Sequence, residues 1–415
     1  MSVHQNTLLA AMNANAKVPR IGSTIAGLSR LRTRIGDCAL TVVTRKRAGG
    51  CSSAPGNSGG AGRDKPVTYH RFARAWVLCC AVALGGCANV QFYTQAVTGQ
   101  ASLLMARRDA HALIDAPGTD PALVRQLQLV SRLLRFAEDE LRLPVDGRYG
   151  SYVELEGVPI WNVVAAPEFA IRPLERCYPL IGCAVYRGFF NRRAAEREAN
   201  RLSAEHDVYL YPVTAYSTLG WFDDPILSSF VHYDEASLAD LIFHELAHSV
   251  VYVSGDSEFN EGFASFVGNE GAIAYLQAHG GDTARYRDRL EAAKAYARFL
   301  SDWRGRLADL YREPVSDAAK RQLKGELFAA MRSSYSRNVE RLGRGRYDNA
   351  FARPFNNARL ALVGTYEDSK HNFERLFNEV GADWPAFYAA VERLAALPKE
   401  GRWGVAQVEV DIGVP

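Results

Sequence analysis

The stretch His244-Glu245-Leu246-Ala247-His248 places two histidines and a carboxylate at the spacing that a zinc hydrolase requires. Residues four apart on a helix lie about 40° apart around its axis, so His244 and His248 can point their imidazoles at one metal ion. Glu245 projects roughly 100° away, which allows its carboxylate to hold a water molecule rather than the metal. The motif therefore predicts a zinc site in which Glu245 is the general base.

The residues around the motif predict that it lies on a helix. Asp234 or Ser237 can cap the start of this helix, and we expect Gly255 to break it. The rival interpretation is a chance HExxH sequence on a buried helix. The apolar stripe at helical spacing consists of Leu238, Leu241, Ile242 and Leu246.

A zinc hydrolase needs a third protein ligand, which leaves one coordination position for water. Glu261 follows His248 at a short distance in the sequence, and gluzincins complete their site with a carboxylate on a second helix packed under the first. We therefore expect Glu261 to be the third ligand, with Glu258 and Glu270 as alternatives. The histidine-rich continuation of metzincins is absent, because the next histidine is His279.

The sequence after Gly255 predicts the second helix. Asp256 or Ser257 can cap its start. Its apolar face consists of Phe259, Phe263, Phe266 and Val267. Three glycines remove side chains along it, as expected where one helix lies close against another: Gly262, Gly268 and Gly271.

Residues 67–86 have the pattern of a bacterial lipoprotein signal peptide. A basic start with Arg71 and Arg74 precedes an apolar run too short to span a bilayer, and small residues precede Cys87. We expect cleavage before Cys87 and lipid on its thiol, with an ordinary buried segment as the alternative. Ala88 is not the aspartate that retains lipoproteins in the inner membrane, so we expect sorting to the outer membrane.

The composition changes at this point of the chain. Residues 1–86 contain 12 Lys and Arg against 2 Asp and Glu, and the remainder contains 37 against 44, so the net charge changes from +10 to −7. A mildly acidic mature protein argues against a nucleic-acid partner, since such domains are usually basic. Residues 1–66 read as a disordered leader. We expect translation to start near Val67, with a genuine cytoplasmic leader as the alternative.

Two cysteines of the mature chain remain when Cys87 is set aside. Cys177 and Cys183 stand close together in the segment CYPLIGC, and in an oxidising periplasm they can close a small loop as a disulfide. A second metal site is the weaker interpretation, because no histidine or further cysteine lies near them in the sequence.

The mature chain reads as an α+β protein in two parts, residues 87–271 and 272–415. The first part begins with helices over 88–145 and continues with a mixed sheet, interrupted by a basic helix near 191–203. The expected strands are 152–155, 161–164, 208–211 and 215–222, the last of which could offer its edge to an extended peptide.

The second part, residues 272–415, reads as an all-helical subdomain that completes the cleft. Residues 284–312 and 316–338 predict a helical hairpin broken at Pro314. The abundant charge of these helices indicates a solvated face, and a partner-binding coiled coil is the minority interpretation.

Several segments resemble the bacterial family of predicted aminopeptidases, which are lipid-anchored zinc peptidases of the gluzincin type. The resemblance covers most of 87–397, including the lipobox cysteine, and none of 1–66. It implies a zincin-like, thermolysin-like α+β core with His244, His248 and Glu261 as zinc ligands. The segments are AYSTLGWFDDPIL (215–227), CYPLIGCAVYRGFF (177–190), HELAHSVVYV (244–253), FNEGFASFVGNEG (259–271) and NNARL (356–360) followed by Tyr366.

One departure from the thermolysin pattern concerns the residue four after the ligand Glu. The Asp that usually orients a ligand histidine there is replaced by Ser265. Ser265 itself, or another carboxylate such as Asp256, must then orient the histidine.

The implied mechanism needs two further groups. A tetrahedral oxyanion needs a hydrogen-bond donor, and an aminopeptidase needs a carboxylate for the free α-amine of its substrate. Tyr366 is the first candidate donor, because it follows the helix over 356–360. The other candidates are Tyr347, Tyr233 and His371 for the donor and Glu270 and Asp224 for the amine-binding carboxylate.

These features predict a zinc aminopeptidase that trims short peptides on the periplasmic side of the envelope. Its partners are then a peptide substrate and, through the lipid on Cys87, the outer membrane. The alternatives are an endopeptidase specific for an envelope protein and a non-catalytic anchored scaffold. The sequence would favour a non-catalytic scaffold if Glu245 or the downstream carboxylate were missing, but it contains both residues.

Overall fold

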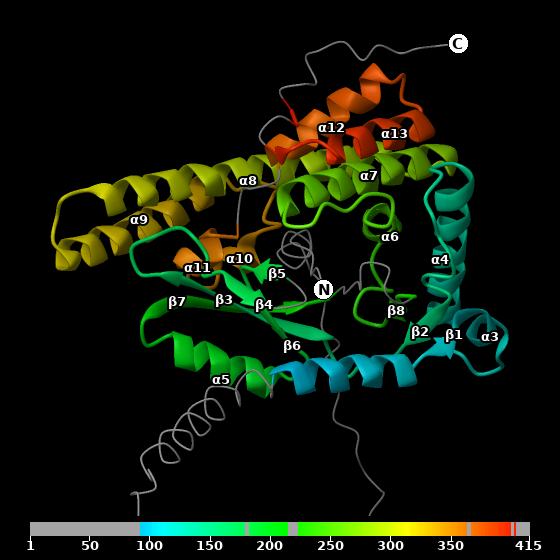
Figure 1. Cartoon of the computed structure of the whole chain (residues 1–415), viewed down its shortest axis with the longest axis horizontal. Coiled ribbons are helices and arrows are strands. Elements are labelled where there is room, and N and C mark those ends of the chain that lie inside the picture. Colours follow the sequence, from blue (N-terminus) through cyan, green and yellow to red (C-terminus); the bar gives the residue numbers. More distant parts are fainter. Residues whose placement is uncertain (1–91, 179–181, 215–222, 363–366, 400–401, 404–415) are drawn as a thin grey trace, which may run out of the picture. The chain divides into compact units, whose positions relative to one another are not determined.

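A computed structural model describes residues 92–178, 182–214, 223–362, 367–399 and 402–403. All of these residues belong to one of the two compact units into which the chain divides, the unit that contains Val90–Pro415. The described part is a mixed α+β fold with small sheets and a helical C-terminal part (Figure 1). Within it, no helix combines the length and the apolar character needed to cross a membrane.

The strands form three small sheets. β6 (Arg187–Phe189), β3 (Ile160–Pro167) and β7 (His206–Val213) make an antiparallel sheet with β3 in the centre. β1 (Arg108–Asp109), β2 (Ser151–Val153) and β8 (Ile226–Leu227) make the second, in which β2 and β8 run parallel. β4 (Arg176–Tyr178) and β5 (Gly182–Ala184) pair as a separate ribbon.

Helices cover both faces of the β6-β3-β7 sheet. α5 (Arg192–Leu202) packs on one face and α11 (Asn357–Leu360) on the other (Figure 1). The alternation of residues along β3 and β7 supplies both contacts, because successive side chains of a strand point to opposite faces. A small apolar cluster lies between α5 and the sheet and includes Val163, Ala165, Phe189, Ala195 and Leu202.

The main core lies around two helices, α6 (Glu235–Ala247) and α7 (Ser257–Ala278), which make the most extensive helix contact of the described residues. α4 (Pro121–Asp139) packs against both helices, and the short α3 (Ala110–Asp115) packs on α4. α12 (Glu367–Glu379) lies along α7 on the side away from α6, and α13 (Trp384–Ala395) packs on α12 (Figure 1). α7 is therefore almost wholly buried.

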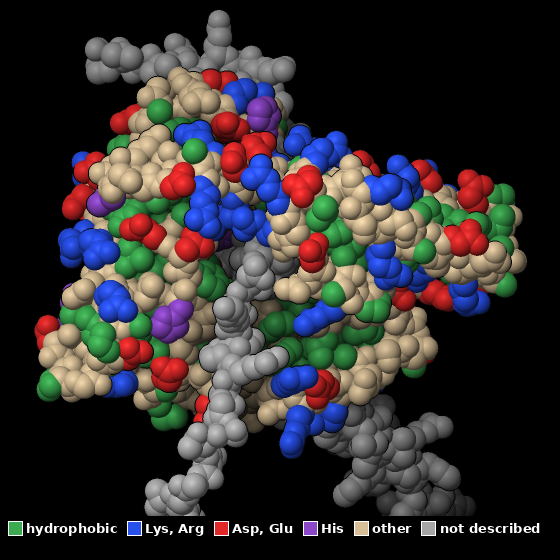
Figure 2. Space-filling model, turned by 180° about the vertical axis from the view of Figure 1, so that it is seen from behind, with side chains coloured by type: hydrophobic (Ala, Val, Ile, Leu, Met, Phe, Trp, Pro, Cys, Tyr) green, Lys and Arg blue, Asp and Glu red, His purple; other side chains and the backbone are tan. Residues whose placement is uncertain are grey.

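α8 (Thr283–Arg312) and α9 (Asp317–Arg337) form the predicted hairpin. Lys, Arg, Asp and Glu side chains cover it where it extends to the right in Figure 2, so its charged face is a solvated surface as expected. The short α10 (Asp348–Phe351) follows, with Phe351 stacked on Tyr335 of α9 at 3.8 Å between ring centroids.

Most of the predicted helices and strands form where they were expected, but the arrangement of the sheet and the end of the motif helix differ from the prediction. Three strands, the helix near 191–203 and the hairpin all form. The expected single mixed sheet is instead three small sheets. The motif helix ends at Ala247 rather than near Gly255, because Val250, Val251 and Val253 are β-branched and disfavour a helix.

A side chain holds the segment that follows α6 in its non-helical path. The amide of Asn260 accepts a hydrogen bond from the backbone N–H of Val253 and donates one to its carbonyl, both at 2.8 Å. This pair of bonds replaces the hydrogen bonds that a longer helix would have formed.

The structure bears on the predicted disulfide through Cys177. Cys177 is disulfide-bonded and lies directly opposite Cys183 in the β4–β5 ribbon. The leader 1–66, the signal peptide 67–86, Cys87, the expected strand 215–222 and Tyr366 lie outside the described residues.

Candidate metal centre

α6 presents both histidines of the motif on one face. The Asp234 carboxylate caps the helix by accepting a hydrogen bond from the Ser237 N–H at 3.0 Å, as one of the two predicted caps. His244 lies in the last turn of α6, and His248 is the C-cap residue that follows Ala247. Both side chains are almost fully buried, and so is Glu245 between them.

α7 approaches α6 closely at a glycine. A Cβ atom on Gly268 would lie 2.7 Å from the backbone oxygen of Asp240 and 3.0 Å from Cβ of His244. Gly271, one turn later, faces Phe243 in the same way, with a Cβ contact of 2.9 Å. The missing side chains therefore bring α7 against the turn of α6 that carries the motif, as the sequence predicted.

A buried polar network holds the two helices together one turn before His244. The Asn269 amide donates to the Asp240 carboxylate at 2.9 Å, and the Lys370 ammonium on α12 donates to the oxygen of the same amide. The Tyr286 hydroxyl of α8 shares this amide at 3.4 Å. Four helices thus meet at one set of hydrogen bonds beside the motif.

One group of metal-type side chains converges in the described part of the chain: His244, His248 and Glu261, whose ligand atoms lie within 4.8 Å of one another. The two Nε2 atoms of His244 and His248 are 3.3 Å apart. Glu261 oxygens lie 3.6 Å from Nε2 of His244 and 4.0 Å from that of His248. Zinc bonds of 2.0–2.2 Å at tetrahedral angles separate ligand atoms by about 3.3–3.6 Å, so the group fits a zinc ion after a small adjustment.

The alternative third ligands lie elsewhere. The side chain of Glu258 is 46% exposed and faces Lys399 at 4.0 Å. Glu270 is surrounded by charged groups of α8 and α12, and burial raises the pKa of its carboxyl. Of the three candidate carboxylates, Glu261 is the one that the fold brings to the histidines.

The structure gives Asp256 a different role from the one suggested by sequence. Its carboxylate pairs with Arg402 and with Lys399, the latter at 3.3 Å, and caps α7 through the Phe259 N–H at 3.3 Å. It is therefore engaged in fixing the start of α7, which makes it a poor choice for orienting a histidine. Ser265 is buried on α7, 7% exposed.

Three of the four candidates for the oxyanion donor make other contacts or are exposed to solvent. Tyr347 stacks on Tyr296 at 3.7 Å in the contact of α8 with α10. The Tyr233 hydroxyl shares a hydrogen bond of 2.7 Å with Thr214. The side chain of His371 is 79% exposed on α12. Tyr366 cannot be placed, because it falls outside the described residues.

Two tyrosines that the sequence analysis did not select lie within electrostatic range of this group. Burial and then the carboxylate of Glu261 raise the pKa of Tyr252, which is 49% exposed. Burial and then the carboxylates of Glu245 and Asp224 raise the pKa of Tyr149 well above 10. Two features of the sequence could have drawn attention to these tyrosines. Tyr252 follows His248 by four residues, and turn-forming glycines stand on both sides of Tyr149.

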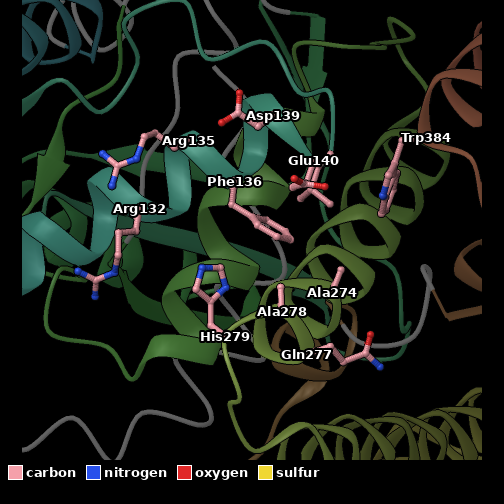
Figure 3. A pocket seen from close by; sticks show the side chains of 11 residues that line it. Arg132, Arg135, Phe136, Asp139, Glu140, Ala274, Gln277, Ala278, His279 and Trp384 are labelled. Carbon is pink, nitrogen blue, oxygen red and sulfur yellow. The ribbon is translucent and has the colours of Figure 1, made fainter.

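A surface pocket lies apart from this group, between α4, the end of α7 and the start of α13 (Figure 3). Phe136, His279 and Trp384 contribute its rings, and Arg132 and Arg135 its cations. None of the residues that line it belongs to the converging group or to the motif.

A family model described as "Putative aminopeptidase" matches residues 91–405, which is most of the chain. The chain belongs to this family. Membership supports peptidase activity, and with it a hydrolase that acts on peptides. Neither the curated proteins nor the solved structures gave a match.

Proposed function

We propose that the protein is a zinc-dependent aminopeptidase that acts on short peptides at the periplasmic side of the bacterial envelope. The observation that carries the proposal is the buried convergence of His244, His248 and Glu261 with Glu245 on the same turn of α6. Two imidazoles and one carboxylate are the donor set of many catalytic zinc sites, which keep a fourth position open. Membership of the aminopeptidase family supports the choice of substrate class.

The zinc, when bound, would lower the pKa of a water molecule and polarise the scissile carbonyl. Glu245 acts as the general base: its carboxylate accepts a proton from the attacking water and later delivers it to the leaving amine. His244, His248 and Glu261 hold the ion, and their burial keeps them in one arrangement. In this proposal the zincin-like core lies within residues 87–271, and the described helices of residues 272–415 complete its substrate cleft.

The proposed location rests on the sequence alone. Cleavage before Cys87 and lipid on its thiol would tether the enzyme to the outer membrane. Short peptides in the periplasm would then reach the enzyme without transport across the inner membrane.

The test compares a short peptide with its N-acetylated twin, using purified chain with and without a chelator. The proposal expects cleavage of the free peptide, much slower cleavage of the acetylated one, and loss of both with chelator. Equal rates on both peptides would replace the aminopeptidase by an endopeptidase.

A variant separates the base from the ligands. Glu245→Gln keeps the size of the side chain but cannot accept the proton, so it should bind zinc as the parent does while turnover falls by about 10²-fold or more. Full activity in this variant would reject the zinc-hydrolase mechanism.

A further inference from the structure

The first helix of the described residues, over 92–105, differs from the rest of the surface in charge and in exposure. It contains no Asp, Glu, Lys or Arg, whereas these four types make up 23% of the chain. The two most exposed large apolar side chains of the described part both lie on it: Val97 is 69% exposed and Met105 is 80% exposed. Single exposed apolar residues are ordinary, but a surface helix without any charge is not.

One face of this helix is fixed to the protein. The side-chain amide of Gln95 donates to the Gly188 carbonyl of β6 at 3.4 Å, and its oxygen accepts from the Phe190 N–H at 3.0 Å. Leu103, two turns further along, is buried in the main core. The side of the helix that carries Gln95 and Leu103 therefore faces the protein.

The opposite face is apolar, and its hydroxyl groups have partners within the helix. Val97 and Met105 each follow an inward residue by two positions, which turns them about 200° around the axis to the outer side. Beside them, the Thr98 hydroxyl donates to the Thr94 carbonyl at 2.8 Å and the Ser102 hydroxyl to the Thr98 carbonyl at 2.9 Å. Because these hydroxyls are bonded to the backbone, the face can leave water without losing hydrogen bonds.

α5 places arginines next to this face. Figure 1 shows α5 and the helix over 92–105 along the same lower edge of the sheet, and Phe92 packs against the apolar cluster between α5 and the sheet. Arg193 and Arg197 are exposed, and each lies two positions from the buried Ala195, so both point away from the sheet. Neither forms an ion pair with a residue that the structure describes, and the glutamates of α5 pair with other arginines.

The position of Cys87 identifies what can cover this surface. Cys87 precedes Phe92 by five positions, and five residues span at most about 18 Å. A lipid on Cys87 would therefore hold the start of the helix at the membrane surface. An uncharged apolar face is suited to the boundary between head groups and acyl chains, and arginines are suited to anionic head groups.

We propose that the outer face of the helix over 92–105 lies on the membrane that holds the lipid of Cys87. Val97 and Met105 enter the boundary of the acyl chains, and Arg193 and Arg197 contact anionic phospholipid head groups. The helix lies in the plane of the surface and is a second attachment beside the lipid, which fixes the orientation of the enzyme on the membrane. The proposal rests on the proposed location at the membrane.

The experiment uses the mature, lipid-modified protein in phospholipid vesicles that contain phosphatidylglycerol. Met105→Cys carries an environment-sensitive fluorophore on the outer face of the helix. Val315→Cys is the matched control, because Val315 is also an exposed apolar residue, 41% exposed, but lies in the turn between α8 and α9. We expect nitroxide-labelled lipid to quench the label at position 105 and iodide in the water to quench the label at position 315.

Substitutions away from the label test the two parts of the surface. Val97→Asp should lower the ratio of docked to undocked label at position 105 at least about 10-fold, since one buried valine is lost. Leu323→Asp, at an exposed apolar position on α9, should leave the ratio unchanged. Arg193→Gln combined with Arg197→Gln should lower the ratio about 30-fold on anionic vesicles and leave it unchanged on vesicles of neutral lipid. Peptidase activity on a short peptide should equal that of the parent in all these variants.

The outcomes distinguish this inference from the function on which it rests. A parent that cleaves peptides while both labels are quenched by iodide alone overturns the membrane contact and leaves the function. A label at position 105 that neither quencher reaches assigns the face to a second copy of the chain, and also overturns the membrane contact. A parent that cleaves nothing, but docks position 105 on the lipid, overturns the peptidase function and keeps the contact. A mature chain without lipid on Cys87 overturns the proposed location and the contact together.

Discussion

Substitution of Gly268 by alanine tests how the close approach of α7 to α6 builds the metal centre. The added Cβ would lie 2.7 Å from both the backbone oxygen and Oδ1 of Asp240, whereas ordinary contacts begin at 3.4 Å. The backbone oxygen cannot rotate away, so the two helices must separate by roughly 0.7 Å at this point. Metal sites tolerate errors of about 0.2 Å in ligand distance, and His244 lies on the displaced turn. Zinc affinity should therefore fall at least about 10-fold.

The same substitution should affect stability in two opposing ways. Overpacking of a close contact costs about 1–3 kcal/mol. Replacing glycine by alanine inside a helix gains about 1 kcal/mol, so the net loss is about 0–2 kcal/mol. Gly325→Ala on α9 is the matched control, because nothing lies within 4 Å of its added Cβ, and it should stabilise the fold with zinc affinity unchanged.

Competition with a chromogenic chelator measures zinc affinity, and urea unfolding of the metal-free protein measures stability. The argument that this helix contact positions His244 would be refuted if Gly268→Ala bound zinc as tightly as the parent protein and gained as much stability as Gly325→Ala.

Two further predictions concern pH and the anchor. Burial raises the pKa of Glu270 above its ordinary 4.5, so its contribution to stability is present below that pH and is lost as the pH rises through the raised pKa. Glu270→Gln should therefore raise Tm relative to the parent more at pH 7 than at pH 3, and an equal difference at both pH values would argue against this. Cells that express the full chain should contain a membrane-bound, lipid-modified form that begins at Cys87, and Cys87→Ser should abolish it; a mature N-terminus upstream of Cys87 would contradict the signal-peptide assignment.

The sequence predicts the parts of the site that depend on local spacing. His244, Glu245 and His248 share one helix, and Glu261 follows on the next, so helical periodicity and one short connection bring them together. The α8–α9 hairpin was predictable for the same reason, since Pro314 marks its turn between two long helical patterns.

The place of Tyr149 could not be read from spacing. Its N–H bonds to the Asp224 carbonyl beside the parallel pairing of β2 with β8, strands far apart in the sequence and only a few residues long. Its left-handed backbone is also hidden, because a tyrosine gives no local sign of a positive φ, and only the neighbouring glycines indicated a turn. Which short strands pair over a long sequence distance depends on how the whole core packs. The periodicity of apolar residues within one segment does not contain that information.

The most direct test of the proposed metal centre is the zinc content of three purified proteins. Glu258 and Glu261 are one turn apart on α7, but Glu261 approaches the histidines while Glu258 faces solvent and Lys399. Mass spectrometry of the bound metal should give about one zinc per chain in the parent and in Glu258→Ala, and should show loss of most of it in Glu261→Ala. Equal zinc in Glu261→Ala and the parent would contradict the assignment of the third ligand and the centre built on it.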